Sequence, residues 1–543
     1  MKDTQEQKHK DSWGRKWLQT VTDREERKQL FHEFQQTVDC HPEIIFYESM
    51  SGAKMMDSPF SIFEHLFECP PTDSGYLHVW SARSQEVVPL RYSDLDSVVT
   101  VRRHTPAYFY YLARAKYVIS NSALPEYFVR RPEQRYLNTW HGIGYKTLGR
   151  TDRNPLGAAL AVSNMLQATH VISPCEFMTG IHLNGFSMAN TFAGKFAETG
   201  YPRIDATLNA SESDKNELYS ILGCKSQERI VTYAPTWRGE AFDVDRLRSD
   251  LHSLAQLDCT VVFLGHHLML KYVSLDILDE VVVPPEDVNT NRLLSITDVL
   301  ITDYSSIFFD FLVTDRPIVH YVYDYAEYSI NRGLNLTKDE LPGLVASTSD
   351  ELITAVSWSL TTGLGATGNY RDHLARFNPH DSGDSTRRVV DWFLRDRTAL
   401  VRQLEGINEH PRIVFWGGRL GADEVLDTYF REMKTTAENN DADVSLFISR
   451  SVRRNQAAMK WIRYLGPSIS IIVRDEYSFG MTADERAARE VAGTQRSGLE
   501  TLAYDRIYQR EYRRMFGDTR FDEVLQFPGL SHFWKRLSQE AYK

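Results

Sequence analysis

Short apolar segments alternate with longer amphipathic segments along most of this chain. EIIFYES (43–49), DVLITD (298–303) and RIVFWGG (412–418) are typical of buried strands, because their apolar residues are nearly continuous. Between such segments, stretches such as SPFSIFEHLFE (58–68) and VDRLRSDLHSLAQL (244–257) have the three-and-four spacing of helices. This alternation predicts an α/β fold with a largely parallel sheet.

At 543 residues the chain is too long for one hydrophobic core, and the alternation starts again near residues 203 and 411. We therefore predict a helical segment and three α/β units, at residues 1–42, 43–202, 203–398 and 411–543. Four residues of the helical segment form a candidate apolar stripe: Trp13, Trp17, Leu18 and Val21. Packing of this stripe on its own domain is favoured over attachment to a membrane surface.

The composition excludes several classes of protein. A net charge of −11 excludes a nucleic-acid binder held by bulk charge. The five cysteines are scattered and form no CxxC pair, which predicts reduced thiols rather than disulfides or a zinc site. No run of about 18 apolar residues occurs, and the first residues lack the apolar core of a secretory signal. We therefore expect a cytoplasmic protein without a spanning helix.

The segment VLITDYSSIFFDF (299–311) joins a buried strand directly to a helix. Asp303, Tyr304, Ser305 and Ser306 therefore lie where the carboxyl end of the strand meets the helix N-terminus. Ligands of parallel sheets bind at this edge, where free N–H groups and the helix dipole attract phosphate. The serines add hydroxyl donors, although Ser305 could serve only as the helix N-cap.

Two further strands end in groups that suit a phosphate. VTYAPTWRGE (231–240) presents Arg238, whose planar fork matches a phosphate, although a surface or domain-interface arginine also fits. VVFLGHH (261–267) ends in His266 and His267, of which at most one faces the cleft because neighbouring residues point to opposite faces. Such a histidine can donate to a phosphoryl oxygen. No third ligand stands at metal spacing, which argues against zinc.

The segment LNTWHGIGYKTLGR (137–150) places His141 after a strand and before two glycines, where backbone can approach a ligand closely. His141 is placed to accept a proton from an attacking hydroxyl, and a histidine that only caps a helix is the alternative. Lys146 and Arg150 would suit an anionic acceptor. By contrast, GGRLGADE (417–424) lacks the spacing of a dinucleotide loop and indicates close strand–helix packing.

These motifs follow one another in a fixed order, which is more specific than any one of them. The ordered motifs are WHG (140–142), ISPCEF (172–177), ETGYPRID (198–205), YAPTWR (233–238), DVLITDYSSIFFDF (298–311) and RPIVHYVYD (316–324). Their order resembles the CDP-glycerol glycerophosphotransferase family, the teichoic acid primases and polymerases of bacteria. FYESMSGAKMMDSP (46–59) and RGLNLTKDELPG (332–343) are similar to its opening strand and late segment.

The resemblance implies the GT-B architecture, with two Rossmann-like domains facing each other across a cleft, here followed by a third Rossmann-like unit. It implies transfer of glycerol phosphate from CDP-glycerol to an acceptor hydroxyl, with release of CMP. By resemblance, His141 is the general base, and His267 is a second essential histidine beside the donor pyrophosphate. The remaining site residues that it implies are Arg238, Thr236, Asp303, Ser305 and Ser306 for the donor phosphates, and Lys146, Gly142 and Glu48 for the acceptor.

Three features of the chain depart from this family pattern. Ile143-Gly144-Tyr145 stand where the family has Thr-Pro and a lysine, although Lys146 remains, so the acceptor stays open. Gly265-His266 stand where a more basic or aliphatic pair is common, so CDP-ribitol or another nucleotide-activated polyol phosphate is an alternative donor. Residues 411–543 lie outside the likeness, and EYRRMFGDTRFDEVLQFPGLSHFWKRL (511–537) resembles part of the N-terminal half of GT-B glycosyltransferases. We expect this unit to be catalytically incomplete or a docking domain.

We therefore expect a phosphotransferase that primes or extends a teichoic-acid-like or capsular polyol-phosphate polymer. The expected partners are a CDP-alditol, a lipid-linked or polymeric polyol-phosphate or glycan acceptor, and the inner face of the cell membrane, with no nucleic acid. The sequence predicts no definite cofactor and leaves a divalent cation open. A nucleotide-sugar glycosyltransferase or a UDP-sugar 2-epimerase is the alternative enzyme, and a scaffolding protein with an inactive cleft is the non-enzymatic alternative.

Overall fold

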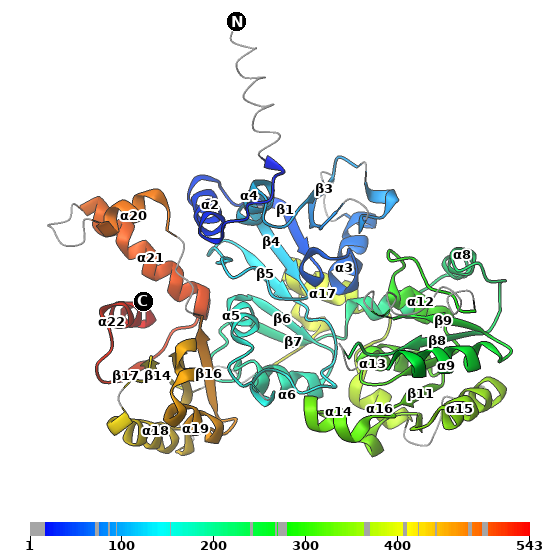
Figure 1. Cartoon of the computed structure of the whole chain (residues 1–543). Helices are drawn as coiled ribbons and strands as arrows, with labels where there is room; N and C mark the ends of the chain where they lie inside the picture. The colour runs from blue at the N-terminus through cyan, green and yellow to red at the C-terminus, as the bar shows by residue number, and fades with distance from the viewer. Residues whose placement is uncertain are drawn as a thin grey trace, which may run out of the picture.

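The structure is a computed structural model that describes residues 17–542 apart from short gaps. The gaps are residues 71–74, 85–86, 94, 153, 239–242, 266–268, 270–279, 363–369, 405–409, 422, 440–441, 476–480 and 491–497. The described strands form three sheets, with the first in the middle of the molecule and the other two on either side of it (Figure 1).

Eight strands form the central sheet, in the order β13-β7-β6-β5-β4-β1-β2-β3. Neighbouring strands are parallel except for β13, which runs antiparallel to β7. Their bounds are β1 (His41–Glu48), β2 (Leu77–Ser81), β3 (Val98–Val101), β4 (Ala115–Ser120), β5 (Arg135–Asn138), β6 (His170–Ser173), β7 (Lys195–Glu198) and β13 (Arg402–Gln403). Nearly continuous burial along these strands is typical of a parallel sheet covered by helices on both faces.

The helices of this first lobe are α2 (Arg24–Thr37), α3 (Asp57–Glu68), α4 (Pro106–Arg114), α5 (Ala159–Gln167) and α6 (Glu176–Gly185). Their starts follow local rules: Thr105 caps α4 by accepting the Tyr108 N–H at 3.2 Å, directly before Pro106. Trp17 packs on this lobe, with its ring 5.9 Å from Phe34 and 5.3 Å from Tyr110. The apolar stripe near the N-terminus is therefore at least partly used within its own domain.

Five parallel strands form the sheet of the second lobe, in the order β12-β11-β10-β8-β9. They are β8 (Ile230–Ala234), β9 (Thr260–Phe263), β10 (Val299–Thr302), β11 (Ile318–Tyr321) and β12 (Leu344–Ala346). The helices are α7 (Asp205–Leu208), α8 (Glu212–Ile221), α9 (Val244–Ala255), α12 (Thr290–Ile296), α13 (Ile307–Phe311), α14 (Tyr325–Arg332), α15 (Ser349–Thr362) and α16 (Tyr370–Phe377). Successive residues of β10 alternate between faces, so Ile301 and Leu300 belong to different hydrophobic clusters.

The chain returns to the first lobe after the second sheet. Helix α17 (Ser385–Arg395) places Trp392 and Phe393 against His170 of β6, with ring centroids 4.7 and 5.1 Å apart. Strand β13 then pairs with β7 at the edge of the central sheet. Residues 385–403, although they follow the second sheet in sequence, therefore complete the first lobe.

Four parallel strands form the sheet of a third unit, in the order β16-β15-β14-β17. They are β14 (Arg412–Gly418), β15 (Asp443–Ser449), β16 (Ile469–Arg474) and β17 (Glu523–Gln526). The helices are α18 (Asp423–Glu438), α19 (Gln456–Tyr464), α20 (Ala483–Glu490), α21 (Gly498–Phe516) and α22 (His532–Ser538). At the end of β14, a Cβ on Gly418 would lie 2.6 Å from Leu530 Cδ2, so this glycine does serve close packing.

The third unit docks firmly on the first lobe through buried polar contacts. Asn190 Nδ2 donates to the carbonyl oxygens of Val444 and Ser468 at 3.0 and 2.6 Å. Arg150, which the sequence suggested for an anionic acceptor, instead donates to carbonyl oxygens of the third unit, including that of Leu465 at 3.0 Å. Strand β7 begins at Lys195, a few residues after Asn190 makes these contacts.

Gly517 follows α21 at this interface, and we predict that it tolerates no side chain. It has a φ of +58°, and a Cβ would lie 2.2 Å from the Leu166 carbonyl oxygen. Gly529 has a φ of +78° but nothing within 4 Å of a Cβ. Gly529→Ala should lower the free energy of unfolding by about 1–2 kcal/mol through backbone strain alone. Gly517→Ala should lower it by more than about 3 kcal/mol, because backbone must also move.

Urea unfolding of the full chain, followed by tryptophan fluorescence, compares the two variants. Equal losses of stability in Gly517→Ala and Gly529→Ala would show that the contact with Leu166 does not constrain the interface.

Candidate active site

The carboxyl ends of β8 and β10 meet at one edge of the second sheet. Thr302, the last residue of β10, is paired with Ala234, the last residue of β8. The Asp303 carboxylate then accepts the backbone N–H of Thr236, at 2.9 and 3.0 Å from its two oxygens. This bond ties the loop after β8 to the loop after β10. Thr236, Asp303 and the two serines that follow are thereby brought to the same edge.

The serines present hydroxyl groups that are only weakly used within the protein. Ser306 is the N-cap residue of α13, but its side chain makes no capping hydrogen bond. Ser305 Oγ accepts the Ile307 N–H at a long 3.4 Å. Because α13 has only five residues, its dipole is weaker than the sequence argument required. The hydroxyl groups of Ser305 and Ser306 are therefore the main hydrogen-bond donors between β10 and α13.

Arg238 lies at the same edge, but its guanidinium is already paired. It donates to the Asp324 carboxylate from Nε at 2.7 Å and from Nη2 at 3.2 Å, and Nη1 lies 2.9 Å from Asp303. Three tyrosine rings surround the guanidinium at 5.0–5.7 Å. Two carboxylates thus offset the charge of Arg238, and its side chain is only 7% exposed. In this structure Arg238 organises the edge rather than facing open space.

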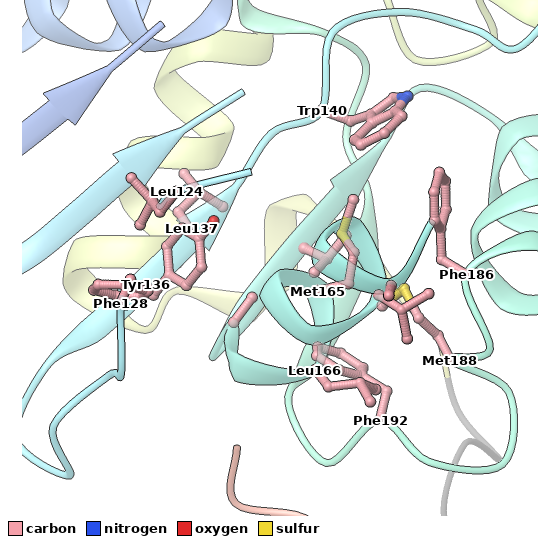
Figure 2. Close-up of a cluster of buried hydrophobic side chains, with 14 of the residues drawn as sticks. Leu124, Phe128, Tyr136, Leu137, Trp140, Met165, Leu166, Phe186, Met188 and Phe192 are labelled. Carbon is pink, nitrogen blue, oxygen red and sulfur yellow. The ribbon is translucent and has the colours of Figure 1, made fainter. Parts of the chain in front are cut away.

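His141 stands in the loop after β5 of the first lobe. Asn138 Oδ1 accepts the Trp140 N–H at 3.0 Å, and Trp140 adopts a φ of +54°, which turns the chain. The indole packs against Phe186 with ring centroids 4.7 Å apart, at the border of a buried apolar cluster (Figure 2). The His141 ring lies 4.2 Å from the same indole, so the hydrophobic core positions the imidazole.

A hydrogen bond fixes the tautomer of His141. Its Nδ1 lies 2.8 Å from the Asn121 carbonyl oxygen, which can only accept, so Nδ1 carries the proton and Nε2 keeps its lone pair. Desolvation by the surrounding protein lowers the pKa of His141, while the bond to Asn121 and the charge of Asp57 oppose this shift. The residue keeps an exposed side. A neutral imidazole with a free Nε2 is the form that a general base needs.

The loop that carries His141 in the first lobe approaches Ser306 of the second lobe closely. A Cβ built on Gly142 would lie 3.0 Å from Ser306 Oγ and 3.3 Å from Arg203 Nη2. Gly142 has a φ of +145°, a conformation that glycine adopts readily and other residues rarely do. The missing side chain therefore allows close approach of the two lobes next to His141.

Arg203 links the two lobes beside this contact. It donates to both oxygens of Asp310 in α13 at 2.7 and 2.8 Å, and to Asp57 at the start of α3 at 3.0 Å. Burial alone would lower the pKa of Arg203, but the two carboxylates outweigh burial and raise it. Sequence reasoning missed this group. The sequence did contain a signal, because Asp57, Arg203 and Asp310 interrupt segments that are otherwise mostly apolar or typical of turns. These segments are DSPF (57–60), YPRID (201–205) and FFDF (308–311).

A second strip of contact between the lobes holds Lys146. Lys146 forms an isolated antiparallel bridge with Leu334, and the Asn335 side chain donates to the carbonyl oxygens of Gly144 and Lys146 at 2.8 and 3.1 Å. The Lys146 ammonium lies 5.9 Å from the centre of the Tyr328 ring. Burial lowers the pKa of Lys146, although the charge of Asp303 opposes this shift. Lys146 of the first lobe is therefore close to the polar edge of the second.

Glu48, one of the residues implied by resemblance, stands apart from this group. Glu48 is fully buried, where it accepts the Tyr108 hydroxyl at 2.8 Å and lies 3.1 Å from Arg103, so it has no exposed surface for an acceptor. His267, with its neighbour His266, lies outside the residues that the structure describes. The role of His267 therefore stays a prediction.

The described residues include no cluster of three or more histidine, cysteine, aspartate or glutamate side chains arranged to hold a metal ion. Among them, no helix has the length and apolar character needed to cross a bilayer.

Comparison with known proteins gives a consistent result over the first two lobes. The sequence model of the CDP-glycerol:poly(glycerophosphate) glycerophosphotransferase family matches residues 30–395. The teichoic acid poly(glycerol phosphate) polymerase of Bacillus spizizenii is 30% identical over 371 residues, which cover 65% of this chain and 92% of that protein. The teichoic acid glycerol-phosphate transferase of Staphylococcus aureus is 28% identical over 345 residues, covering 58% of this chain and 83% of that protein.

A solved structure of the wall teichoic acid polymerase TagF has the same fold. It superimposes with a TM-score of 0.60 at 24% sequence identity, and covers 68% of this chain and 93% of that chain. The predicted GT-B-like α/β fold is confirmed by this similarity.

We predict that the Arg203 link is essential to the stability of the two lobes. Arg203→Met leaves Asp57 and Asp310 buried without their cation, so the free energy of unfolding should fall by about 3–5 kcal/mol. Arg431→Met removes an arginine that is 72% exposed and pairs with Asp427 one helical turn away, and should cost about 0.5 kcal/mol or less. Urea unfolding of the full chain measures both, and similar losses would contradict the proposed importance of the link.

Proposed function

We propose, since the chain belongs to the CDP-glycerol:poly(glycerophosphate) glycerophosphotransferase family, that this enzyme transfers glycerol phosphate from CDP-glycerol to an acceptor hydroxyl. The acceptor oxygen forms a bond to the β-phosphorus, the bond from that phosphorus to the bridging oxygen breaks, and CMP leaves. The main support for the proposal is the close approach of the loop that carries His141 to Ser306, at the start of α13. It brings a proton acceptor and hydroxyl donors together from opposite lobes.

His141 acts as the general base in this proposal. Its Nε2 lone pair is free because Nδ1 donates to the Asn121 carbonyl oxygen at 2.8 Å. The acceptor hydroxyl therefore gives its proton to Nε2 as its oxygen attacks the phosphorus. Holding the base at a rigid loop, anchored through Trp140, contributes orientation as well as basicity.

The donor phosphates lie against the edge formed by the loops after β8 and β10. Ser305 and Ser306 offer hydroxyl donors, and the Thr236 hydroxyl is buried without a hydrogen-bond partner among the described residues. Lys146 supplies positive charge, and Arg238 supports the edge through Asp303. Phosphoryl transfer needs mainly positioning and charge stabilisation, which this combination provides. We keep His267 as a further donor-phosphate ligand.

The acceptor in this proposal is a polyol-phosphate chain or a lipid-linked primer. A lipid-linked acceptor is confined to the membrane, so the enzyme works as a peripheral protein at the cytoplasmic face. Support comes from the names of the relatives, which act in teichoic acid synthesis. Co-sedimentation with vesicles that contain a lipid-linked primer, compared with vesicles that lack it, tests this placement.

We predict that the purified chain releases CMP from CDP-glycerol when a glycerol-phosphate acceptor is present. A panel of CDP-glycerol, CDP-ribitol and UDP-N-acetylglucosamine, followed by nucleotide chromatography, separates the candidate functions. CMP from CDP-glycerol supports the proposal, and CMP from CDP-ribitol alone would change the donor. UDP from the nucleotide sugar, with no CMP from either CDP-alditol, would overturn it.

We predict that His141→Gln lowers kcat by at least about 100-fold, the usual contribution of a positioned general base. CDP-glycerol should still raise the Tm of this variant, because the donor binds on the other lobe. His252→Gln is the matched control, since His252 is exposed on α9 and bonds only Glu280 among the described residues. Its turnover should equal that of the natural chain. Full turnover by His141→Gln would remove His141 as the base.

The pH dependence gives an independent test of the same role. Because the pKa of His141 is lowered below 6.5, the neutral form persists into mildly acidic solution. The midpoint of the decline in kcat/KM with falling pH should therefore lie below pH 6.5. A decline that is already half complete above pH 6.5 would contradict this assignment.

A further inference from the structure

A cavity of about 490 Å³ lies between the first lobe and the third unit. One wall comes from α2 and the loop at residues 129–133, and the other from α21 and the residues after it. Six arginines line it: Arg130, Arg131, Arg506, Arg510, Arg513 and Arg520. We call this the arginine cavity. Because both parts of the chain supply arginines, the site exists only when the third unit is docked.

The charge of the arginine cavity is opposite to that of the protein. The chain has a net charge of −11, yet only two acidic residues, Glu133 and Glu540, line the cavity with the six arginines. Collecting like charges in a recess raises the local potential and attracts anions. Some of these arginines have a structural role only. The contacts of each one show which guanidinium groups are available to a ligand.

Three of the arginines are engaged within the protein. Arg130 is buried, donates to the Gln167 and Gln134 carbonyl oxygens at 2.7 and 3.0 Å, and pairs with Asp518. Arg510 donates to both oxygens of Glu485 at 2.7 Å each. Arg131 donates to a carbonyl oxygen of the first lobe at 2.6 Å. These side chains shape the walls of the arginine cavity.

The other three retain charge that a ligand can use. Within the described part of the chain, Arg506 and Arg513 have no carboxylate within 4.0 Å and no hydrogen-bond partner. Arg520 covers the Tyr512 ring at 5.4 Å and donates to the carbonyl oxygen of Thr519, the residue before it, so no carboxylate is among these partners. Burial lowers the pKa of Arg513, the charges of Asp518 and Glu133 oppose this shift, and the neighbouring cations Arg130 and Arg520 add to it. A bound anion would relieve this crowding of positive charge.

We propose that the arginine cavity binds the phosphate groups of a short stretch of phosphodiester chain. Arginine forks bind phosphate oxygens in pairs, and several forks facing one recess suit consecutive phosphates rather than a single anion. A volume of about 490 Å³ is that of a ligand pocket and holds only a few repeat units. That the chain is a polyol phosphate rests on the proposed function, whereas the affinity for phosphate does not.

The position of the cavity separates it from the transfer site. Figure 1 shows α21 on the side of the central sheet that faces away from the second lobe, whose edge carries Ser305 and Ser306. The arginine cavity therefore holds chain that has already been made, not the donor. A nucleic acid is disfavoured because stacking platforms are few: the rings among the lining residues are Tyr512, which Arg520 covers, and His32. A membrane surface is disfavoured because the arginines lie in a recess between two units.

Binding of a fluorescent synthetic oligo(glycerol phosphate) to the full chain tests this proposal. The natural chain should bind the oligomer at 0.15 M salt, and Arg506→Gln/Arg513→Gln should bind it at least about tenfold more weakly. Arg453→Gln/Arg454→Gln is the matched control, because both arginines are exposed in the same unit but lie outside the cavity. This control should bind as tightly as the natural chain. The Tm of both double variants should stay unchanged, since neither pair has an ion-pair partner among the described residues.

Parallel measurements distinguish the sources of phosphate. Inorganic phosphate should compete only weakly, and phosphatidylglycerol vesicles or a single-stranded oligonucleotide should not displace the oligomer at equal phosphate concentration. Equal binding by the cavity variant and the control, or preferred binding of vesicles or oligonucleotide, would overturn the proposal. Because binding is measured without CDP-glycerol, a failure of CMP release would refute the proposed function and leave this result standing.

Discussion

The buried guanidinium of Arg203 is the interaction on which the arrangement of the two lobes depends. It lies in the connection between the lobes and bonds a carboxylate from each, Asp57 and Asp310. A buried ion group of this kind contributes little net stability compared with an apolar replacement, but it tolerates only one geometry. Arg203 also stands next to Gly142, and its charge and that of Asp57 both act on His141. One network therefore sets the separation of the lobes and the environment of the imidazole.

Two contacts between short loops of the two lobes accompany the Arg203 link. Beside Arg203, the backbone at Gly142 approaches Ser306, and further along, Asn335 of the second lobe holds the carbonyl groups around Lys146. Both contacts use backbone or small side chains, so little movement is possible without breaking them. The polar edge of β8 and β10 is thereby kept facing the loop after β5.

The sequence was sufficient to predict the strands that lead into the site. Residues 299–302 and 230–234 are mostly apolar and bounded by polar residues, so the edge and its serines followed directly. The short strands β12, β13 and β17 were not predicted, because their pairing depends on partners distant in sequence. The same limit applies to Arg203 and to Arg150. Nothing in the local pattern tells whether a guanidinium faces a ligand, a carboxylate of another lobe or the carbonyl groups of a docked unit.

Arg238 shows that the type of a residue does not by itself identify its binding partners. Its fork suits a phosphate, yet Asp303 and Asp324 take it up, which leaves serine hydroxyls and Lys146 to face the donor on the proposed function. This division has a physical reason. Catalysis requires groups that bind the transition state better than the ground state, and a fully available arginine fork would hold substrate and CMP too firmly. A site that only retains a finished chain has no such requirement, and there the available forks of Arg506 and Arg513 are an advantage.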